Sequence, residues 1–178
     1  LHIGTDEVYG SCAQGHCLES RILNPSNPYS ATKAAADLMV NSFYITYRLP
    51  VLITRSTNNF GPYQYPEKVI PLFVTNAIEN KRVPLYGKGI NVRDWLFVLD
   101  NCRAIDLVFH KGRVGEIYNI AAGNYMNNLK LTQLILKKLH KPETLIEFVK
   151  DRPGHDLRYS LNCSKINRLG WRPQYSFY

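Results

Sequence analysis

The sequence lacks the features that mark membrane proteins and metal proteins. No apolar run approaches the ~20 residues that a membrane-spanning helix needs, which argues against a membrane protein. The four cysteines, Cys12, Cys17, Cys102 and Cys163, show no Cys-x-x-Cys spacing of the kind that binds zinc or iron–sulfur clusters. We therefore expect no metal, no membrane partner, and reduced thiols in a cytoplasmic protein.

The sequence also lacks an arginine-rich arm or any other signature of nucleic-acid binding, although it is basic. Lys and Arg number 22 against 14 Asp and Glu, a net charge of +8. Nucleic acid, an acidic membrane surface and a small anion such as a diphosphate all fit this charge. Because the basic residues are scattered among Gly, Pro and aromatic residues, we expect a sugar phosphate and no nucleic acid.

A third absence concerns dinucleotide binding. A Gly-x-Gly-x-x-Gly turn in a first βαβ unit cradles a dinucleotide pyrophosphate, and the sequence contains no such turn. Gly87-Lys88-Gly89 lacks the third glycine and the helix that should follow it. Since residues 1–4 already read as the interior of a strand, we expect the 178 residues to be a piece of a larger protein, starting within a domain.

What the sequence does contain is a regular alternation of predicted strands and helices. Strands are expected at 1–5, 51–55, 83–86, 93–98, 116–121 and 146–149. Helices are expected at 28–48, 66–81, 100–108, 129–139 and 164–169, and residues 11–26 and 56–63 read as loops. This alternation indicates the α/β class.

The predicted helix from Pro28 carries a pair of residues that could act together. Asn27 suits the N-cap and Pro28 suits the first helical position. Tyr29 and Lys33 are four residues apart, which places both side chains on one face. The apolar positions expected to form the buried face are Ala34, Ala35, Leu38, Met39, Phe43 and Ile45. On this interpretation Tyr29, Lys33 and Asp37 lie away from the buried face.

A tyrosine beside a lysine has a chemical use. A free tyrosine has a pKa of about 10, and a nearby ammonium group lowers the pKa by favouring the phenolate. The phenolate can then take a proton from a sugar or alcohol hydroxyl. The alternative is a solvated tyrosine beside a solvated lysine, because this spacing often occurs by chance.

Two adjacent carboxylates, Asp6 and Glu7, follow the first predicted strand. Ligands bind at the carboxyl ends of strands in open α/β sheets. Two carboxyl groups in different environments can divide the roles of acid and base between them. The alternative is a simple turn, which Asp favours. Asn58 and Asn59 follow the next strand and could bond a ligand, or could merely form a turn.

Taken together, these residues resemble the extended short-chain dehydrogenase/reductase superfamily, and within it the nucleotide-sugar 4,6-dehydratases of the dTDP-glucose 4,6-dehydratase type. The motifs that carry the resemblance are Thr5-Asp6-Glu7-Val8-Tyr9-Gly10, Asn27-Pro28-Tyr29-Ser30-Ala31-Thr32-Lys33, Thr57-Asn58-Asn59-Phe60-Gly61-Pro62-Tyr63, Pro66-Glu67-Lys68, Arg93-Asp94-Trp95, Tyr118-Asn119-Ile120 and Asp151-Arg152-Pro153-Gly154-His155. The Thr-Asp-Glu triplet favours the dehydratases over the related epimerases, which carry no such acid pair there.

The resemblance implies a reaction with bound NAD. Tyr29, with its pKa lowered by Lys33, would deprotonate the sugar 4-hydroxyl while hydride passes to NAD. Glu7 would remove the C5 proton, Asp6 would protonate the departing 6-hydroxyl, and hydride would return to C6. Thr5 would hydrogen-bond the sugar near its 4-hydroxyl. The product would be a 4-keto-6-deoxy sugar.

The resemblance also implies binding residues. Tyr29, Lys33 and Asn59 would contact the nicotinamide half of NAD. The nucleotide-sugar pocket would be lined, besides Thr5, by Asn58, Lys68, Val69, Pro84, Tyr86, Arg93, Asn128, Arg152 and His155. Arg93 and Arg152 suit a diphosphate because guanidinium groups match phosphate oxygens. The alternatives are an ion pair of Arg93 with Asp94 and edge packing of Tyr86.

By resemblance, the chain is the C-terminal part of an extended, doubly wound Rossmann-type fold with a small substrate-binding lobe. Residues 1–65 would hold the catalytic half of the dinucleotide-binding domain. Residues 66–178 would form mainly the nucleotide-sugar lobe, with some returning Rossmann elements. The N-terminal dinucleotide-binding half is absent from the sequence, so we expect these residues alone to bind NAD poorly and to have little activity. A homodimer is expected.

The sequence does not distinguish dTDP-glucose from UDP-glucose as the substrate. dTDP-glucose and UDP-glucose differ in a base whose recognition depends on loop shape. A nucleotide-sugar epimerase or decarboxylase, and a non-catalytic nucleotide-sugar-binding relative, are the alternatives to a dehydratase.

Overall fold

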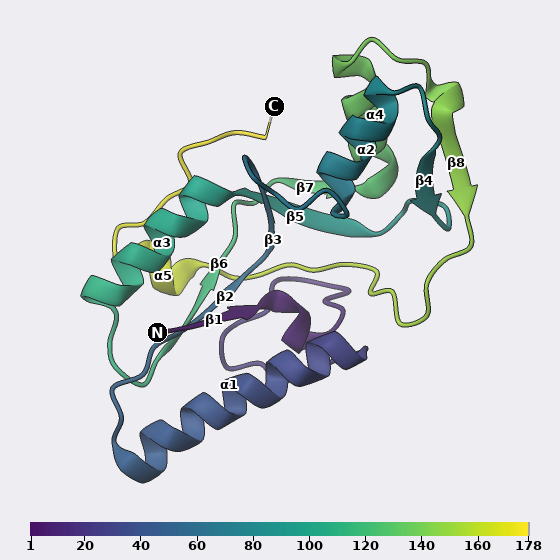
Figure 1. Ribbon diagram of the computed structural model, residues 1–178. Coiled ribbons are helices and arrows are strands. Elements are labelled where there is room, and N and C mark those ends of the chain that lie inside the picture. The colour runs from purple at the N-terminus through teal and green to yellow at the C-terminus, as the bar shows by residue number, and fades with distance from the viewer. Residues whose placement is uncertain (178) are drawn as a thin grey trace.

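The computed structural model, which describes residues 1–177, is an α/β fold, as predicted. Its main sheet contains three parallel strands in the order β1 (His2–Thr5), β2 (Ile53–Ser56) and β6 (Ile117–Ile120). Helix α1 (Pro28–Tyr47) lies on one side of this sheet, and α3 (Val98–Lys111) and α5 (Ser164–Arg168) lie on the other (Figure 1). No helix within residues 1–177 is long and apolar enough to cross a membrane.

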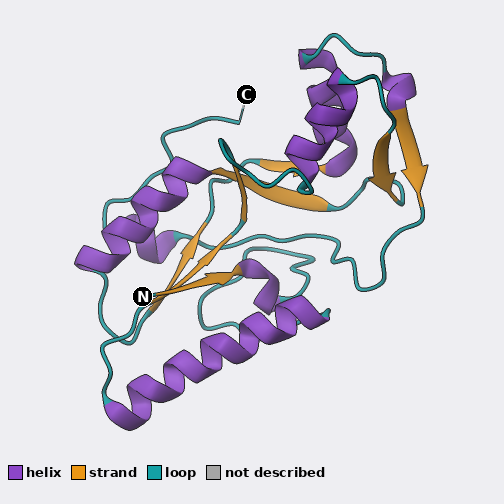
Figure 2. Ribbon diagram, viewed as in Figure 1, coloured by secondary structure: helices purple, strands orange, loops and turns teal. Residues whose placement is uncertain are grey.

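Two further sheets complete the fold, one of three strands and one of two. Strand β5 (Val92–Phe97) pairs in parallel with β3 (Asn58–Phe60) and antiparallel with β7 (Tyr125–Asn127). The parallel pair β4 (Val83–Tyr86) and β8 (Ile146–Val149) forms a lobe with helices α2 (Val69–Ile78) and α4 (Asn128–Lys138), and the short helix η2 (Glu143–Leu145) precedes β8 (Figure 2). The lobe has its own apolar core, which includes Phe73, Leu85, Leu131 and Leu136.

Three sequence-based predictions of elements were wrong. Residues 58–60, predicted as loop, form β3, because their backbone pairs with β5. Residues 125–127, which were not predicted as a strand, form β7 by pairing with the same strand. Both strands are three residues long, too short to show a period of two. Helix α2 begins at Val69, so Pro66 and Glu67 precede it.

Asp100, the first residue of the helix predicted at 100–108, holds a distant part of the chain. Helix α3 begins at Val98, so Asp100 lies within its first turn. The buried carboxylate accepts hydrogen bonds from the backbone N–H groups of Gln174 and Tyr175, at 2.8 and 3.0 Å. Asp100 therefore anchors the distant C-terminal segment, which sequence spacing could not indicate.

The start of α1 is as predicted. The Asn27 side chain accepts a hydrogen bond from the Ser30 N–H at 2.9 Å, and the Ser30 hydroxyl accepts one from the Asn27 N–H at 3.2 Å. This reciprocal capping box, with Pro28 at the first helical position, fixes where the helix begins. It thereby fixes the position of Tyr29, one residue later.

The predicted buried face of α1 was right at Ala34 and wrong at its other positions, which are exposed. Leu38 and Met39 are 61% and 62% exposed, whereas Ser30, Ala34 and Asp37 are buried. Asp37 is buried because it forms an ion pair with Arg55 on β2, with 2.7 Å between Oδ2 and Nε. Its other oxygen lies 3.1 Å from the His2 ring. The position of one ion pair thus decides which side of the helix faces the sheet.

This ion pair belongs to a buried polar network. The Arg55 guanidinium also donates to the Tyr9 hydroxyl at 2.7 Å, and that hydroxyl donates to the Asn119 side chain at 2.9 Å. Tyr9 ends the short 3-10 helix η1 (Asp6–Tyr9), which carries the acid pair. The network therefore joins the helix of Tyr29, the acid pair and two strands of the sheet.

Replacing Asp37 with Asn should lower the free energy of unfolding of the whole protein by about 3 to 5 kcal/mol, because Arg55 would keep a buried, unpaired charge. Urea unfolding followed by circular dichroism would measure the change. Asp106→Asn, at an exposed position on α3, is the matched control and should change stability little. Equal unfolding midpoints for the two variants would contradict the role given to this ion pair.

Candidate active site

The acid pair and Tyr29 share one cavity at the carboxyl ends of the strands. Strand β1 ends at Thr5, and η1 begins with Asp6 and Glu7. The cavity has a volume of about 400 Å³, and Thr5, Asp6, Glu7, Tyr29, Lys33, Asn58 and Asn59 all line it. Residues predicted from three separate motifs are thus brought together.

Asp6 lies in an environment that favours its neutral form. The side chain is 3% exposed. Burial, and then the charge of Glu7, raise the pKa of Asp6 to about 8, against the smaller opposing effects of Arg93 and Thr5. The Thr5 hydroxyl donates to Oδ1 at 3.3 Å and also accepts from the Glu7 N–H at 3.3 Å. Asp6 can therefore hold a proton at neutral pH and donate it.

Tyr29 and Lys33 lie on one face of α1, but the predicted lowering of the Tyr29 pKa is not found. Partial burial, followed by the charges of Glu7 and Asp6, raises the pKa of the Tyr29 phenol. The Lys33 ammonium donates to the Ile3 carbonyl at 2.9 Å, so its charge is held at strand β1. The acid pair, rather than the lysine, is the main charged influence on this phenol.

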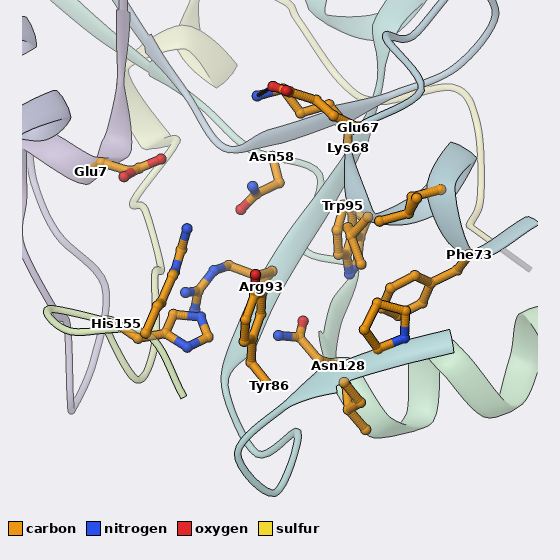
Figure 3. Close-up of a pocket in the computed structure, with 15 residues that line it drawn as sticks. Glu7, Asn58, Glu67, Lys68, Phe73, Tyr86, Arg93, Trp95, Asn128 and His155 are labelled. Atoms are coloured by element: carbon orange, nitrogen blue, oxygen red, sulfur yellow. Dashed lines mark ion pairs between the residues drawn. The ribbon is translucent and has the colours of Figure 1, made fainter. Parts of the chain in front are cut away.

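A second cavity of about 400 Å³ adjoins the first, and Glu7, Asn58 and Lys68 line both. Figure 3 shows Arg93, His155 and Tyr86 facing the same space as Glu7. The nine residues predicted for the nucleotide-sugar pocket besides Thr5 all line it: Asn58, Lys68, Val69, Pro84, Tyr86, Arg93, Asn128, Arg152 and His155. The lining combines charged side chains, such as Glu7, with apolar ones, such as Val69 and Pro84.

Arg93 does not pair with Asp94, so that alternative was wrong. Its guanidinium donates to the carbonyls of Val92 and Asp156 at 2.8 and 2.9 Å. It also lies over the Tyr159 ring, 4.2 Å from the ring centre. Asp94 points the other way and accepts from the N–H groups of Gly123 and Asn124. Neighbouring strand residues face opposite sides of a sheet, which explains the separation.

Tyr86 is not confined to edge packing. It is 47% exposed, lines the second cavity, and its ring centre lies 6.3 Å from that of His155. His155 in turn contacts Asp151, with 2.7 Å between Nδ1 and Oδ1. Burial is the main cause that lowers the pKa of His155.

Several residues at or beside the site were not predicted from the sequence. The buried Tyr159 donates to Asp156 at 2.7 Å, and burial and the charge of Glu7 raise its pKa. Its only sequence signal is its place after the Arg-Pro-Gly-His motif. Tyr159 packs against Arg93, whereas Glu67, Gln64, Asn101 and Trp95 line the cavities themselves. Among residues 1–177, no group of three or more His, Cys, Asp or Glu is placed to hold a metal ion.

Comparison with known proteins identifies close relatives. The sequence profile of the family described as GDP-mannose 4,6 dehydratase matches residues 1–178. The chain is 51% identical to the low-salt glycan biosynthesis protein Agl12 of Haloferax volcanii and 50% identical to a dTDP-glucose 4,6-dehydratase of Streptomyces niveus, and each match covers 99% of the chain. These matches cover 57% and 53% of the two relatives, so the chain spans about half their length.

A solved structure agrees with the fold. A dTDP-glucose 4,6-dehydratase from Streptomyces venezuelae, crystallised with NAD, superposes with a TM-score of 0.98 at 52% identity. The match covers 99% of the chain and 55% of that protein. The fold of the described residues is therefore that of part of an extended Rossmann-type enzyme.

The raised pKa of Asp6 predicts a pH dependence of stability. Its pKa is about 8 in the folded protein, against an ordinary value of 3.8, so between these values the folded state keeps a proton that the unfolded chain releases. The free energy of unfolding should therefore fall as pH rises, by about 1.4 kcal/mol per pH unit. Asp6→Asn should remove this slope.

Urea unfolding of the whole protein at pH 5, 6 and 7 would measure the slope. Glu147→Gln, at an exposed position on β8, is the control and should retain it. A difference between wild type and Asp6→Asn that stays constant over this range would show that Asp6 does not hold a proton in the folded state.

Proposed function

This chain belongs to the GDP-mannose 4,6 dehydratase family, and on that premise we propose that the whole protein is an NAD-dependent lyase that converts dTDP-glucose to its 4-keto-6-deoxy sugar. The observation that carries the proposal is the buried Asp6, with a pKa of about 8, beside Glu7 in the cavity that Tyr29 lines. Elimination of water needs an acid and a base at neighbouring carbons. A neutral carboxyl group adjacent to a second carboxylate meets this need.

The residues of the first cavity fit a nicotinamide group. The side-chain oxygens of Thr57, Asn59, Gln64 and Asn101 are buried, have no partner among the described residues, and belong to residues that line it. Such oxygens can accept hydrogen bonds from a carboxamide. Tyr29, Lys33 and Asn59 would hold this half of NAD. Bound NAD would accept a hydride from the substrate and return it.

The residues of this chain would then move the protons. Tyr29 would take the proton from the 4-hydroxyl, because the positive nicotinamide ring of bound NAD would oppose the charges of Glu7 and Asp6 that raise the Tyr29 pKa. Thr5 would hold that hydroxyl by a hydrogen bond. The 4-ketone acidifies the C5 proton, which Glu7 would remove and later return to C5 when the hydride is delivered to C6. Asp6 donates its proton to the 6-hydroxyl, which leaves as water. Epimerisation at C4 needs no such acid–base pair, so the acid pair favours dehydration over the epimerase alternative.

The second cavity would bind the nucleoside diphosphate. Arg93 and Arg152 suit the diphosphate because guanidinium groups form paired hydrogen bonds with phosphate oxygens. Asn58, Lys68, Val69, Pro84, Tyr86, Asn128 and His155 complete the pocket. The curated relative named above as a dTDP-glucose 4,6-dehydratase supports dTDP as the carrier. Assays with dTDP-glucose and UDP-glucose side by side would separate the two carriers.

We also propose the organisation of the whole protein. Residues 1–65 belong to the dinucleotide-binding domain, and residues 66–178 form mainly the nucleotide-sugar lobe. The protein acts in the cytoplasm as a homodimer. The exposed apolar side chains of Leu38, Met39 and Phe43 on α1 support pairing with a second copy.

Replacing Tyr29 with Phe in the whole protein should abolish oxidation of dTDP-glucose, because the base that removes the 4-hydroxyl proton is lost. Binding of dTDP should stay nearly unchanged. Formation of the 4-keto-6-deoxy product and calorimetric binding would measure the two effects. A variant that keeps most of its turnover would show that Tyr29 is not the base.

Replacing Glu7 with Gln should leave oxidation in place but prevent removal of the C5 proton. Reduced cofactor should therefore accumulate, and its absorbance at about 340 nm would report this. Glu79→Gln, at an exposed position beyond the end of α2, is the control and should turn over normally without accumulation. No reduced cofactor in Glu7→Gln would count against the role of Glu7.

A further inference from the structure

One buried donor in the second cavity has no partner. The indole of Trp95 is 2% exposed, and its Nε1 forms no hydrogen bond within the described part of the chain. Nearly all buried polar groups in proteins are hydrogen-bonded, so an unpaired one needs an explanation. Because Trp95 lines the cavity, a bound molecule could supply the missing acceptor.

The strand geometry places Trp95 beside the diphosphate residues. Arg93 and Trp95 are two residues apart on β5, so their side chains lie on the same face of the sheet. Both line the cavity, whereas Leu96 packs into the core on the other face. Two residues along a strand span about 7 Å. Trp95 is therefore close enough to Arg93 for one nucleotide to contact both.

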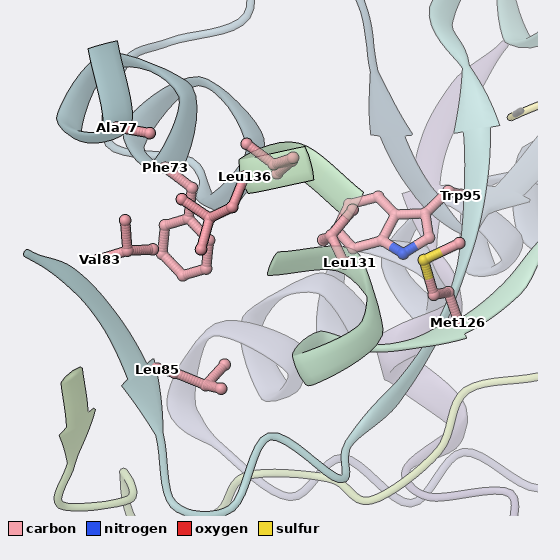
Figure 4. Packing of buried hydrophobic residues seen from close by; sticks show 9 residues of the cluster. Phe73, Ala77, Val83, Leu85, Trp95, Met126, Leu131 and Leu136 are labelled. Carbon is pink, nitrogen blue, oxygen red and sulfur yellow. The ribbon is translucent and has the colours of Figure 1, made fainter. Parts of the chain in front are cut away.

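The surroundings of Trp95 are apolar, unlike those of Arg93. Figure 4 shows its indole packed in the lobe core with Met126 and Leu131. In Figure 3, Trp95 and Phe73 lie on the side of the cavity away from Glu7, and the indole nitrogen is on the side of Asn128. An apolar, flat-walled end beyond a pair of cationic residues suits the base of a nucleotide whose diphosphate lies at Arg93.

We propose that the indole N–H of Trp95 donates a hydrogen bond to a carbonyl oxygen of the pyrimidine base in the bound nucleotide. Thymine and uracil both carry carbonyl oxygens on the ring, and the indole is a donor only. Trp95 therefore helps to select a pyrimidine with a correctly placed carbonyl. This inference rests on the proposed function, which supplies the nucleotide.

Binding of dTDP and of inorganic pyrophosphate to the whole protein would test this. Trp95→Phe keeps an aromatic ring but removes the donor, so dTDP should bind about fivefold to tenfold more weakly. Pyrophosphate has no base, so its affinity should not change. The control is Trp171→Phe, because the Trp171 indole already donates to the Asp100 carbonyl at 3.2 Å. This variant should bind both ligands normally.

The NMR signal of the indole N–H proton provides a second measurement. This signal would not shift on nucleotide binding if Trp95 had only a structural role. In protein labelled with ¹⁵N-tryptophan, the Trp95 signal is assigned by its loss in Trp95→Phe. Addition of dTDP should shift this proton downfield, and pyrophosphate should leave it in place.

Three results would overturn the inference. They are an unchanged dTDP affinity in Trp95→Phe, an equal loss for dTDP and pyrophosphate, and an indole signal that dTDP does not move. If wild-type protein bound no dTDP, the proposed function would fail together with this inference. If wild type bound dTDP while the Trp95 signal stayed fixed, the inference alone would fail.

Discussion

The buried ion pair between Asp37 and Arg55 is the constraint on which the rest of this structure depends. It orients α1 so that the Asp37 carboxylate faces the sheet, whereas Leu38 and Met39 face away from it. Through Arg55 and the Tyr9 hydroxyl, the same network holds the short helix that carries Asp6 and Glu7. The acid pair and the helix of Tyr29 therefore cannot shift independently. A buried ion pair of this kind adds little net stability to a protein. Here it fixes the orientation of α1 relative to β2.

The site itself consists of groups that would be unfavourable in an ordinary core. Asp6 is buried with one oxygen unpaired, and the indole nitrogen of Trp95 is also unpaired. Burial raises the pKa of Asp6 to about 8, which makes it a proton donor at neutral pH. Unsatisfied polar groups cost stability. Here they gather along two adjoining cavities, where a ligand can satisfy them.

The local signals in the sequence were sufficient for much of the fold. Asn27 as N-cap and Pro28 at the first helical position located the start of α1, and the strand–helix alternation indicated the α/β class. The elements that were missed or misplaced depend on partners far along the chain. Strands β3 and β7 form because each pairs with β5, which lies between them. Asp100 accepts a hydrogen bond from Gln174, more than 70 positions along the chain. Neither kind of contact leaves a periodic signal in the sequence.

The sequence by itself determined which chemical groups are present and at what spacing. The adjacent acids, the Tyr–Lys pair and the scattered arginines can all be read from the motifs. Only the tertiary structure decided their environments: it buried Asp6, directed Lys33 to the Ile3 carbonyl, separated Arg93 from Asp94, and left Trp95 without a partner. The physical reason is that pKa values and hydrogen-bond partners depend on burial and on neighbours in space, and distant chain segments supply both.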